Sequence, residues 1–312
     1  MSQSSTEIAR QSGPEPEGGS KFKESVGARH GFDRVFAALV FVATMIGIVV
    51  LAVLLIDIAI DGIPRILQDP VGFLTNFPSS LPESAGIYPG LLGSLWLVGL
   101  TALFSVPLGI GAAIYLEEYA TDNWLTRLVE VNISNLAGVP SIIYGLLGLA
   151  IFVNLLGPVT NGNSILSGAL TLSLLILPVI IIATREALRS IPNAVREGGY
   201  ALGATRWEVI RSHLLPMALP GAITGTILAL SRALGETAPL IVVGAVGYIS
   251  FAPSSPFDGY TALPIQIYNF VSQPQPEFKV ELAAAAIVVL MVVLLLTNSI
   301  AIWLRNKYQR RV

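Results

Sequence analysis

Long uncharged stretches recur along this chain, and their lengths predict six membrane-spanning helices. About 20 consecutive apolar residues are needed to cross the hydrocarbon core of a bilayer as a helix. The longest stretch, residues 131–184, has no Asp, Glu, Lys or Arg and is long enough for two spans, which the polar run Gly157–Asn163 divides. The six expected spans are Val35–Ile56, Leu91–Leu116, Val131–Leu156, Ile165–Thr184, Pro220–Val246 and Leu282–Leu304.

The lysines and arginines predict an orientation with both chain ends in the cytoplasm. Basic residues are enriched in cytoplasmic loops. Fifteen of the 18 fall on the side of the two termini, against only Arg65 and Lys279 on the other side. The acidic segment Glu117–Glu130 is also assigned to the inner side, since acidic residues contribute little to this rule. The remaining basic residue, Arg232, lies inside a span.

Composition fits a protein embedded in a lipid bilayer. Hydrophobic residues make up 53% of the chain and charged residues 12%, about half the share usual in a soluble domain. Residues 1–30 are polar, with the run Gly13–Gly19 rich in Gly, Pro and Glu, and we expect a disordered cytoplasmic tail there. Residues 31–312 then form one transmembrane domain, which includes a cytoplasmic loop over residues 185–220.

Several kinds of chemistry are excluded by missing residues. The chain has no cysteine and only two distant histidines, His30 and His213, so no thiolate or histidine metal centre is expected. No Gly-x-x-x-x-Gly-Lys-Ser/Thr loop occurs, so the chain cannot bind ATP in the P-loop manner. A net charge of −2 without a basic stripe predicts no nucleic-acid partner. We expect no catalytic residue, no cofactor and no metal.

The loop over residues 185–220 is predicted to hold two short helices. Pro192 suits a first helical position, and Gly203 suits a left-handed stop after Leu202. Thr205–Glu208 reads as a capping box that starts the second helix, which Pro216 and Pro220 would end. This second helix carries an apolar stripe of Trp207, Ile210 and Leu214. The pair either lies on the bilayer surface or docks a cytosolic partner.

Arg232 and Glu236 are the most informative residues of the sequence. They stand four residues apart, on one face of the helix expected over Pro220–Val246, and each costs about 2.5–3.5 kcal/mol in hydrocarbon on insertion scales. Pro239 predicts a kink beside them. Gly221 and Gly225 form a small-residue face for close helix contact. The pair is either a structural ion pair or an anion site, because a guanidinium matches the oxygens of a tetrahedral oxyanion.

A second arginine and glutamate, Arg185 and Glu186, stand at the inner end of the span Ile165–Thr184. Our main interpretation is a solvated pair at a helix end. The alternative is an inner exit site for a translocated anion.

The loop resembles the EAA loop of permeases from ABC importers. The resemblance rests on Glu197-Gly198-Gly199, Gly203, Ile210 and Leu215-Pro216. The chain has two glycines in place of the usual alanines, and its spacings after Gly203 differ from the motif. In that family the loop sits in a cleft of the ATPase subunit. The resemblance therefore implies that the ATPase-coupling residues here are Glu197, Gly198, Gly199, Ala201, Gly203 and Trp207.

The stretch from Arg232 to Leu240 is similar to a signature of the phosphate importer permeases, Arg-x-x-Gly-Glu-Thr-Ala-Pro. Its ending, Thr-Ala-Pro-Leu, is more like the PstA type of subunit than the PstC type. The resemblance covers roughly residues 86–305. It implies a substrate pathway for inorganic phosphate past Arg232, Glu236 and Thr237. It also implies a PstC-type permease partner, two PstB-type ATPase subunits and a periplasmic phosphate-binding protein.

We therefore expect an all-α, polytopic membrane protein with six transmembrane helices and the type I permease fold of ABC importers. Five helices would form the core, and the N-terminal helix would be peripheral. Two other functions remain open on the residues alone. One is a permease for another oxyanion, such as molybdate or sulfate. The other is a stand-alone secondary transporter or an intramembrane enzyme, although no inverted repeat and no Ser/His or paired-Asp site stands out in the core spans.

Overall fold

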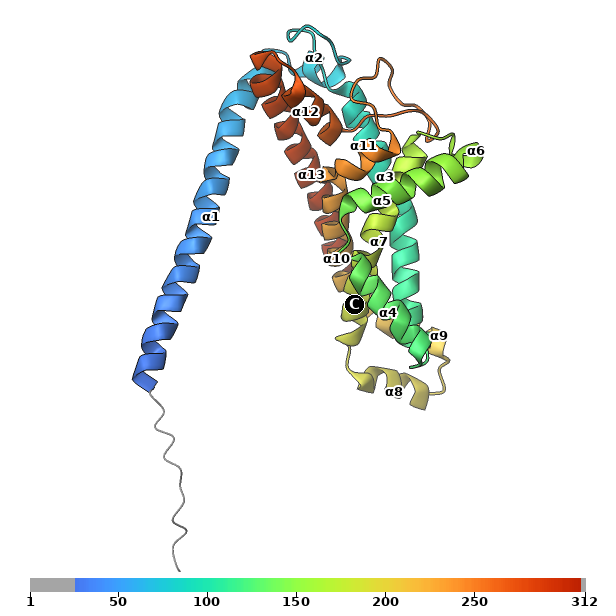
Figure 1. Ribbon diagram of the computed structural model, residues 1–312. Helices are drawn as coiled ribbons and strands as arrows, with labels where there is room; N and C mark the ends of the chain where they lie inside the picture. The colour runs from blue at the N-terminus through green and yellow to red at the C-terminus, as the bar shows by residue number, and fades with distance from the viewer. Residues whose placement is uncertain (1–25, 310–312) are drawn as a thin grey trace, which may run out of the picture. The chain divides into compact units, whose positions relative to one another are not determined.

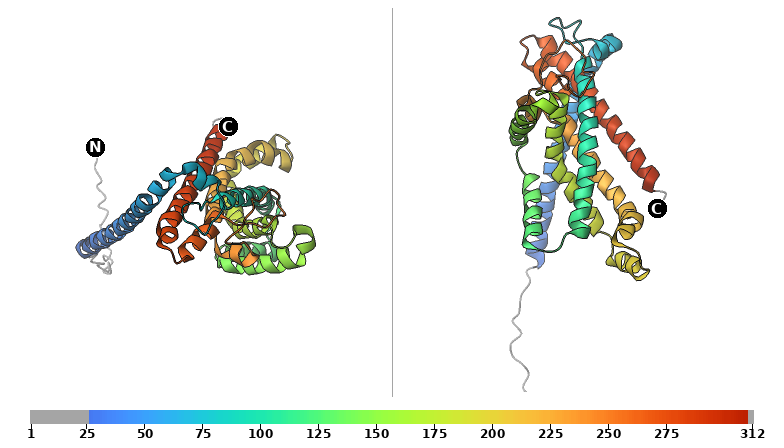
Figure 2. Two further views of the ribbon diagram at one scale, coloured as in Figure 1. Left: turned by 90° about the horizontal axis from the view of Figure 1, so that it is seen from above. Right: turned by 90° about the vertical axis from the view of Figure 1, so that its right-hand side faces the viewer.

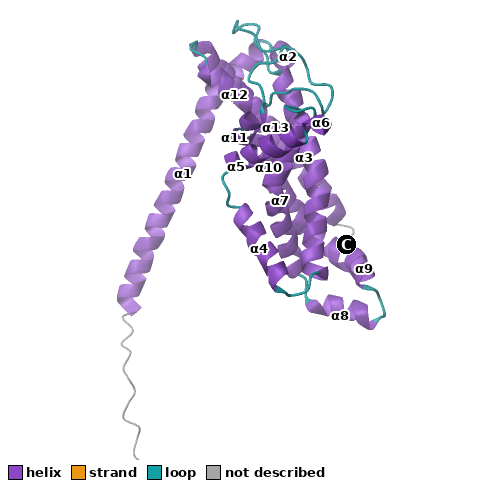
Figure 3. Cartoon of the chain, turned by 45° about the vertical axis from the view of Figure 1, so that its right-hand side comes forward, coloured by secondary structure: helices purple, strands orange, loops and turns teal. Residues whose placement is uncertain are grey.

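The structure is a computed structural model that describes residues 26–309. Within this range every element is a helix (Figure 3). The chain divides into two compact units, residues 1–54 and residues 55–312. Most of the tail expected to be disordered therefore lies outside the described residues, and the first described helix, α1, begins at Val26.

Helix α1 (Val26–Gln68) is an apolar helix that runs from the first unit into the second (blue in Figure 1). Its large apolar side chains between Val35 and Leu54 are exposed, and none of its most apolar 18-residue window is buried. A helix that is apolar on every side must bury its surface in protein or in lipid. The expected span Val35–Ile56 lies wholly within this helix.

Helix α7 (Ile165–Arg189) is the central helix of the second unit (Figure 1). It packs against α3 (Tyr88–Ile114) on one side and α10 (Leu215–Gly235) on another. Two thirds of its most apolar window is buried, against 28% for α3. The Ser164 side chain caps its first turn by accepting a hydrogen bond from the backbone N–H of Ser167. The membrane-span helix that is most enclosed by protein thus also packs against α3, α10 and the α4 and α5 helices.

The remaining elements lie around this centre and at its two ends. One end carries α8 (Asn193–Ala201) and α9 (Arg206–Val209), and the opposite end carries α2 (Pro70–Thr75) and α12 (Leu263–Ser272) (Figures 1 and 2). We call these the α8 end and the α12 end. The other elements, with η marking a π-helical turn, are η1 (Tyr115–Tyr119), α4 (Trp124–Leu136), α5 (Ser141–Gly148), η2 (Leu149–Leu155), α6 (Gly157–Thr160), η3 (Ile210–Leu214), α11 (Ala238–Val243), η4 (Glu277–Leu282) and α13 (Ala283–Gln309).

Close contact between α10 and α7 depends on two glycines, as the sequence predicted. A methyl group added to Gly221 would come within 2.7 Å of the Ala187 side chain, and one added to Gly225 would meet the Ala183 side chain. Small residues four apart let two helix backbones approach closely, which increases van der Waals contact where lipid supplies no hydrophobic drive.

Replacing Gly225 by valine is expected to lower the stability of the protein by about 1–3 kcal/mol, because the added side chain overpacks the α7–α10 contact. The measurement is the apparent melting temperature of the detergent-purified protein. Gly99→Val in α3 is the matched control, since nothing lies within 4 Å of a Cβ atom added there. An equal loss of stability in both variants would contradict the close contact.

A long apolar helix lies at each expected span but the third, although the helix at the fifth span ends at Gly235, short of the expected Val246. The region expected to span from Val131 to Leu156 consists of α4 and the continuous helix α5–η2, which are bent by 108° at residues 137–140. Pro140 explains the break, because it has no backbone N–H to continue α4 and disfavours helical geometry in the residue before it. The third expected span is therefore a pair of helices with a sharp bend between them.

The loop helix continues into the fifth span, contrary to expectation. Pro216 and Pro220 were predicted to end it, yet Pro216 lies in the first turn of α10 and Pro220 inside the helix. The π-helical turn η3 explains the continuity. There the N–H of Leu215 donates to the carbonyl of Ile210, five residues back. This wider turn absorbs the hydrogen bond that Pro216 cannot make.

Candidate functional site

The Arg232–Glu236 pair lies where an apolar span is interrupted. Arg232 is in the last turn of α10, which ends at Gly235, and Glu236 has extended backbone geometry. The Arg232 Nε lies 3.1 Å from the Glu236 Oε1, and the side chains are 46% and 16% exposed. The predicted ion pair is confirmed, and Glu236 is the residue that directly follows the end of the helix. Pro239 cannot donate to the Gly235 carbonyl, and the helix breaks instead of kinking.

Donors are left over at this break. Among the described residues Arg232 donates only through Nε, so its two terminal nitrogens have no protein partner. Thr237 begins α11 without using its hydroxyl as a cap. Guanidinium and hydroxyl groups are both donors of the kind that bind the oxygens of an anion.

The second broken span packs directly against the first. A methyl group on Gly145 of α5 would lie 2.7 Å from the Pro239 Cα, so α5 and α11 touch backbone to backbone. Tyr144 is buried beside Ala229 and Ala233 of α10, and its hydroxyl donates to the Leu136 carbonyl of α4. Broken backbone is tolerated at membrane depth only where protein buries it or a water-filled path runs beside it. The two broken spans thus touch at Pro239, three residues after Glu236.

A further polar contact beside the pair escaped the sequence analysis. The Ser231 Oγ lies 2.7 Å from the Asn298 side-chain oxygen of α13, and the same hydroxyl donates to the Ile227 carbonyl. The single hydroxyl hydrogen can be donated to only one of these two acceptors at a time. The Ser231–Asn298 contact holds α10 against α13 one residue before Arg232. The available signal was an asparagine inside the uncharged run Leu282–Leu304.

The local structure predicted for the 185–220 loop is largely confirmed. Helix α8 follows Pro192, Gly203 adopts a left-handed φ of 81°, and Thr205 and Glu208 form the expected capping box. Gly199 is close-packed, since a methyl group there would come within 2.7 Å of the Val209 side chain.

The apolar stripe predicted for the loop is wrong in part. Ile210 and Leu214 are fully buried against Leu188 of α7, while Leu202 is 90% and Trp207 54% exposed. The other expected coupling residues, Glu197, Gly198, Ala201 and Gly203, are also exposed. The exposed apolar surface of the loop thus includes Leu202 and Trp207, on both sides of the Gly203 turn.

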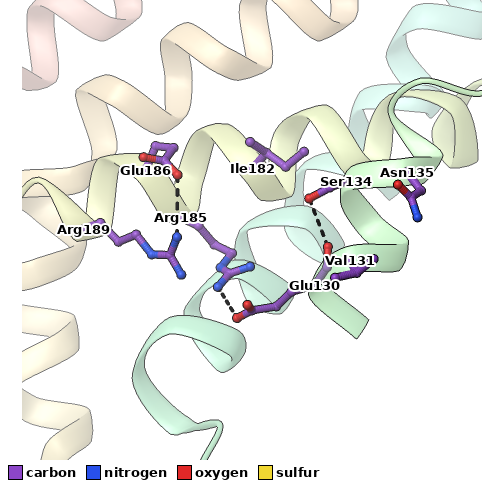
Figure 4. Close-up of a pocket in the computed structure, with 8 residues that line it drawn as sticks. All are labelled: Glu130, Val131, Ser134, Asn135, Ile182, Arg185, Glu186 and Arg189. Carbon is purple, nitrogen blue, oxygen red and sulfur yellow. Dashed lines mark hydrogen bonds and ion pairs between the residues drawn. The ribbon is translucent and has the colours of Figure 1, made fainter. Parts of the chain in front are cut away.

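An ion-pair network at the α8 end is the largest feature that the sequence analysis missed. Arg185 was expected to be solvated and paired with Glu186. It is instead only 7% exposed and bonds Glu117 at 3.3 Å. It also bonds Glu130 of α4 (Figure 4). Glu186 contacts Arg189, which also bonds Glu117 at 2.9 Å. With its donors directed at two carboxylates, Arg185 is poorly suited to bind an anion.

A pocket of about 300 Å³ lies beside this network (Figure 4). Arg185 and Glu130 reach into it from α7 and α4, and Ser134 and Asn135 complete its polar wall. Elsewhere in residues 26–309, no three His, Asp or Glu side chains gather in a way that would hold a metal ion.

Residues 105–312 match the family of binding-protein-dependent transport system inner membrane components. The chain belongs to this family. It is therefore a multi-pass inner membrane protein and the permease component of an ABC importer, in which a separate ATPase subunit hydrolyses ATP.

The chain is also similar to individual named permeases. The chain is 36% identical over 230 residues to the probable ABC transporter permease protein YqgH of Bacillus subtilis, covering 71% of this chain and 72% of that one. It is 39% identical over 198 residues to the phosphate transport system permease protein PstA 1 of Mycobacterium tuberculosis H37Rv, covering 62% of each chain. A probable PstA of Methanocaldococcus jannaschii is 32% identical over 245 residues, with coverage of 78% and 84%.

Solved structures confirm the fold. A chain of a bacterial alginate ABC transporter, crystallised with its alginate-bound periplasmic protein, matches with a TM-score of 0.65 at 18% identity. That match covers 89% of this chain and 96% of the other. The inward-facing MetNI methionine ABC transporter matches with a TM-score of 0.54, covering 72% of this chain. At such identities the likeness shows the fold alone, which is the ABC importer permease fold predicted from the sequence.

Proposed function

We propose that this chain is a permease subunit of an importer for inorganic phosphate, and that Arg232, Glu236 and Thr237 line the substrate pathway. The observation that carries the proposal is the Arg232–Glu236 ion pair at a break in an apolar span, with the terminal guanidinium nitrogens unoccupied. The similarity to PstA proteins of three organisms supports the choice of phosphate.

The chemistry of the pair suits an anion that must pass and leave. Arginine offers a planar fork of donors that matches two phosphate oxygens, and the hydroxyl of Thr237, the residue after Glu236, is a further donor. Without substrate, Glu236 balances the guanidinium charge, which would otherwise be costly in the membrane. An arriving phosphate takes the place of the carboxylate, and the return of Glu236 favours its release.

The proposal also includes an orientation in the membrane, a set of partner proteins and a coupling loop. Both termini are cytoplasmic, so the α8 end faces the cytoplasm and the α12 end faces the periplasm. A PstC-type permease forms the other half of the pathway, and two PstB-type ATPase subunits power it. A periplasmic phosphate-binding protein delivers the anion at the α12 end. Residues 185–220 form the coupling loop, with Glu197, Gly198, Gly199, Ala201, Gly203 and Trp207 at the ATPase.

Uptake of labelled inorganic phosphate by cells that produce the complete transporter tests the substrate. Arsenate, which has the same shape and charge pattern, is expected to compete, and sulfate and molybdate are not. Competition by sulfate or molybdate equal to that by unlabelled phosphate would instead assign the permease to another oxyanion.

Replacing Leu202 by glutamate is expected to reduce co-purification of the ATPase chain at least about tenfold, because a charge replaces an apolar side chain that is almost fully exposed for docking. The measurement is the amount of ATPase recovered with the tagged permease. Leu81→Glu is the matched control, since Leu81 is 68% exposed in the loop between α2 and α3. Equal recovery with both variants would remove Leu202 from the interface.

A further inference from the structure

We propose that Arg196 and Glu118 are positioning residues of the import cycle, which fix the coupling loop to the end of α3 so that loop movement reaches the core helices. The inference rests on the proposed coupling role of residues 185–220. The Arg196 Nη2 lies 2.7 Å from the Glu118 Oε1, and the two side chains are only 16% and 5% exposed. The pair joins α8 to the π-helical turn η1.

Arg196 also binds the end of the central helix. Its terminal nitrogens donate to the carbonyl of Leu188 at 3.1 Å and to that of Ile191 at 3.0 Å. These carbonyls belong to the last turn of α7 and the residues after it, where helix carbonyls lack partners of their own. One guanidinium therefore ties α8, the end of α7 and η1 together.

The turn η1 explains why two successive glutamates both face inward. In an α-helix neighbouring residues point about 100° apart, so one of two adjacent glutamates would face away from the bundle. The wider π-helical turn brings Glu117 and Glu118 closer to one face, and π-turns often mark functional positions. Glu118 binds Arg196 of α8, and Glu117 binds Arg185 and Arg189 of α7.

The same network continues toward the anion site. Arg185 binds Glu117 and Glu130, so α4 is joined to η1 through α7. The other end of α4 is Leu136, whose carbonyl accepts the hydrogen bond of Tyr144. Tyr144 precedes Gly145, which touches Pro239 three residues after Glu236. Contacts therefore run without a gap from the coupling loop to the break that holds the charged pair.

Stability alone is a poor reason for this pair. A buried ion pair is often no more stabilising than apolar residues of the same volume, because both charges lose water. The pair instead fixes the position of α8 relative to η1, because a forked guanidinium binds a carboxylate in one register. An apolar contact could slide as the loop moves, whereas this one carries the displacement into α3.

The test compares the full transporter with Glu118→Gln and Arg196→Lys, each normalised to the amount of assembled complex. Both variants keep the side-chain size but weaken the charged, forked contact. The readout is labelled inorganic phosphate transported per ATP hydrolysed, which a purely structural role would leave unchanged. We expect this ratio to fall about tenfold, within the range typical of coupling between sites.

Asp122→Asn is the matched control, because Asp122 and Arg127 form an ion pair at 3.2 Å with side chains that are 87% and 73% exposed. An unchanged ratio in Glu118→Gln and Arg196→Lys overturns the inference, also when the amount of complex falls. If the unmodified permease recovers no ATPase at all, the coupling role fails and the inference fails with it. A lowered ratio in a complex that still holds its ATPase supports the inference.

Discussion

Replacing Arg232 by alanine is expected to lower phosphate uptake at least about 30-fold, which corresponds to a loss of about 2 kcal/mol. The variant removes the donors that bind the anion. It also leaves the Glu236 carboxylate, only 16% exposed, without its partner at 3.1 Å. The measurement is the initial rate of labelled phosphate uptake at equal amounts of transporter in the membrane.

Two further variants make this expectation specific. Arg232→Lys keeps the charge but loses the planar fork, so uptake is expected to fall between the values of alanine and arginine. Arg127→Ala removes an exposed arginine from the Arg127–Asp122 pair and is expected to leave uptake unchanged. Normal uptake by Arg232→Ala would exclude Arg232 from the pathway.

Replacing Arg185 by methionine is expected to destabilise the protein by about 3 kcal/mol, because a buried arginine that serves two carboxylates is lost. The value is at the low end for a buried pair. The Glu130 side chain is one third exposed, and Glu117 keeps its contact with Arg189. The measurement is thermal unfolding of the purified permease, followed by its apparent melting temperature.

Arg189→Met is the matched comparison, since Arg189 binds the same Glu117 from a side chain that is 48% exposed. Its removal is expected to cost about 1 kcal/mol or less, as for other partly solvated ion pairs. If the two variants lost equal stability, burial of Arg185 would not explain its contribution.

Hydropathy predicted the membrane helices well because the requirement for them is local. A span must be long and apolar whatever its neighbours are, so α3 and α7 begin within a few residues of the expected Leu91 and Ile165. Capping is equally local. The signals at Thr205 and Gly203 therefore gave the correct turn between α8 and α9.

The two helix breaks depend on packing that a single sequence does not display. Pro239 signalled a disturbance in the fifth span, but a proline can either bend a helix or end it. Here α11 turns away and lies against Gly145, a contact between residues 94 positions apart. Pro140 breaks its helix for the same reason. The uncharged run around it nevertheless led to the prediction of one continuous span.

The ion-pair network was unpredictable for a similar reason. Glu117 and Arg185 are 68 residues apart, and no local spacing relates them. The sequence predicted that the acidic segment Glu117–Glu130 lies on the side rich in basic residues, and that Arg185 is solvated. The acidic residues neutralise arginines at the same end of the fold. This pairing explains both the acidic segment on a basic side and the burial of Arg185. Predicting these ion pairs requires knowing which charged residues, from separate parts of the sequence, lie at that end of the fold.

The backbone contact of α5 has a consequence for how this protein tolerates mutation. Gly145 meets Pro239 and Gly148 meets the Thr171 side chain, whereas Ile142 and Leu146 on the same helix are about half exposed. A saturation scan of α5 would therefore divide sharply by position. The two glycines would accept almost nothing, because even alanine inserts a methyl group where another segment already lies. The outward positions would accept any apolar residue, so divergence within α5 would accumulate on one side only.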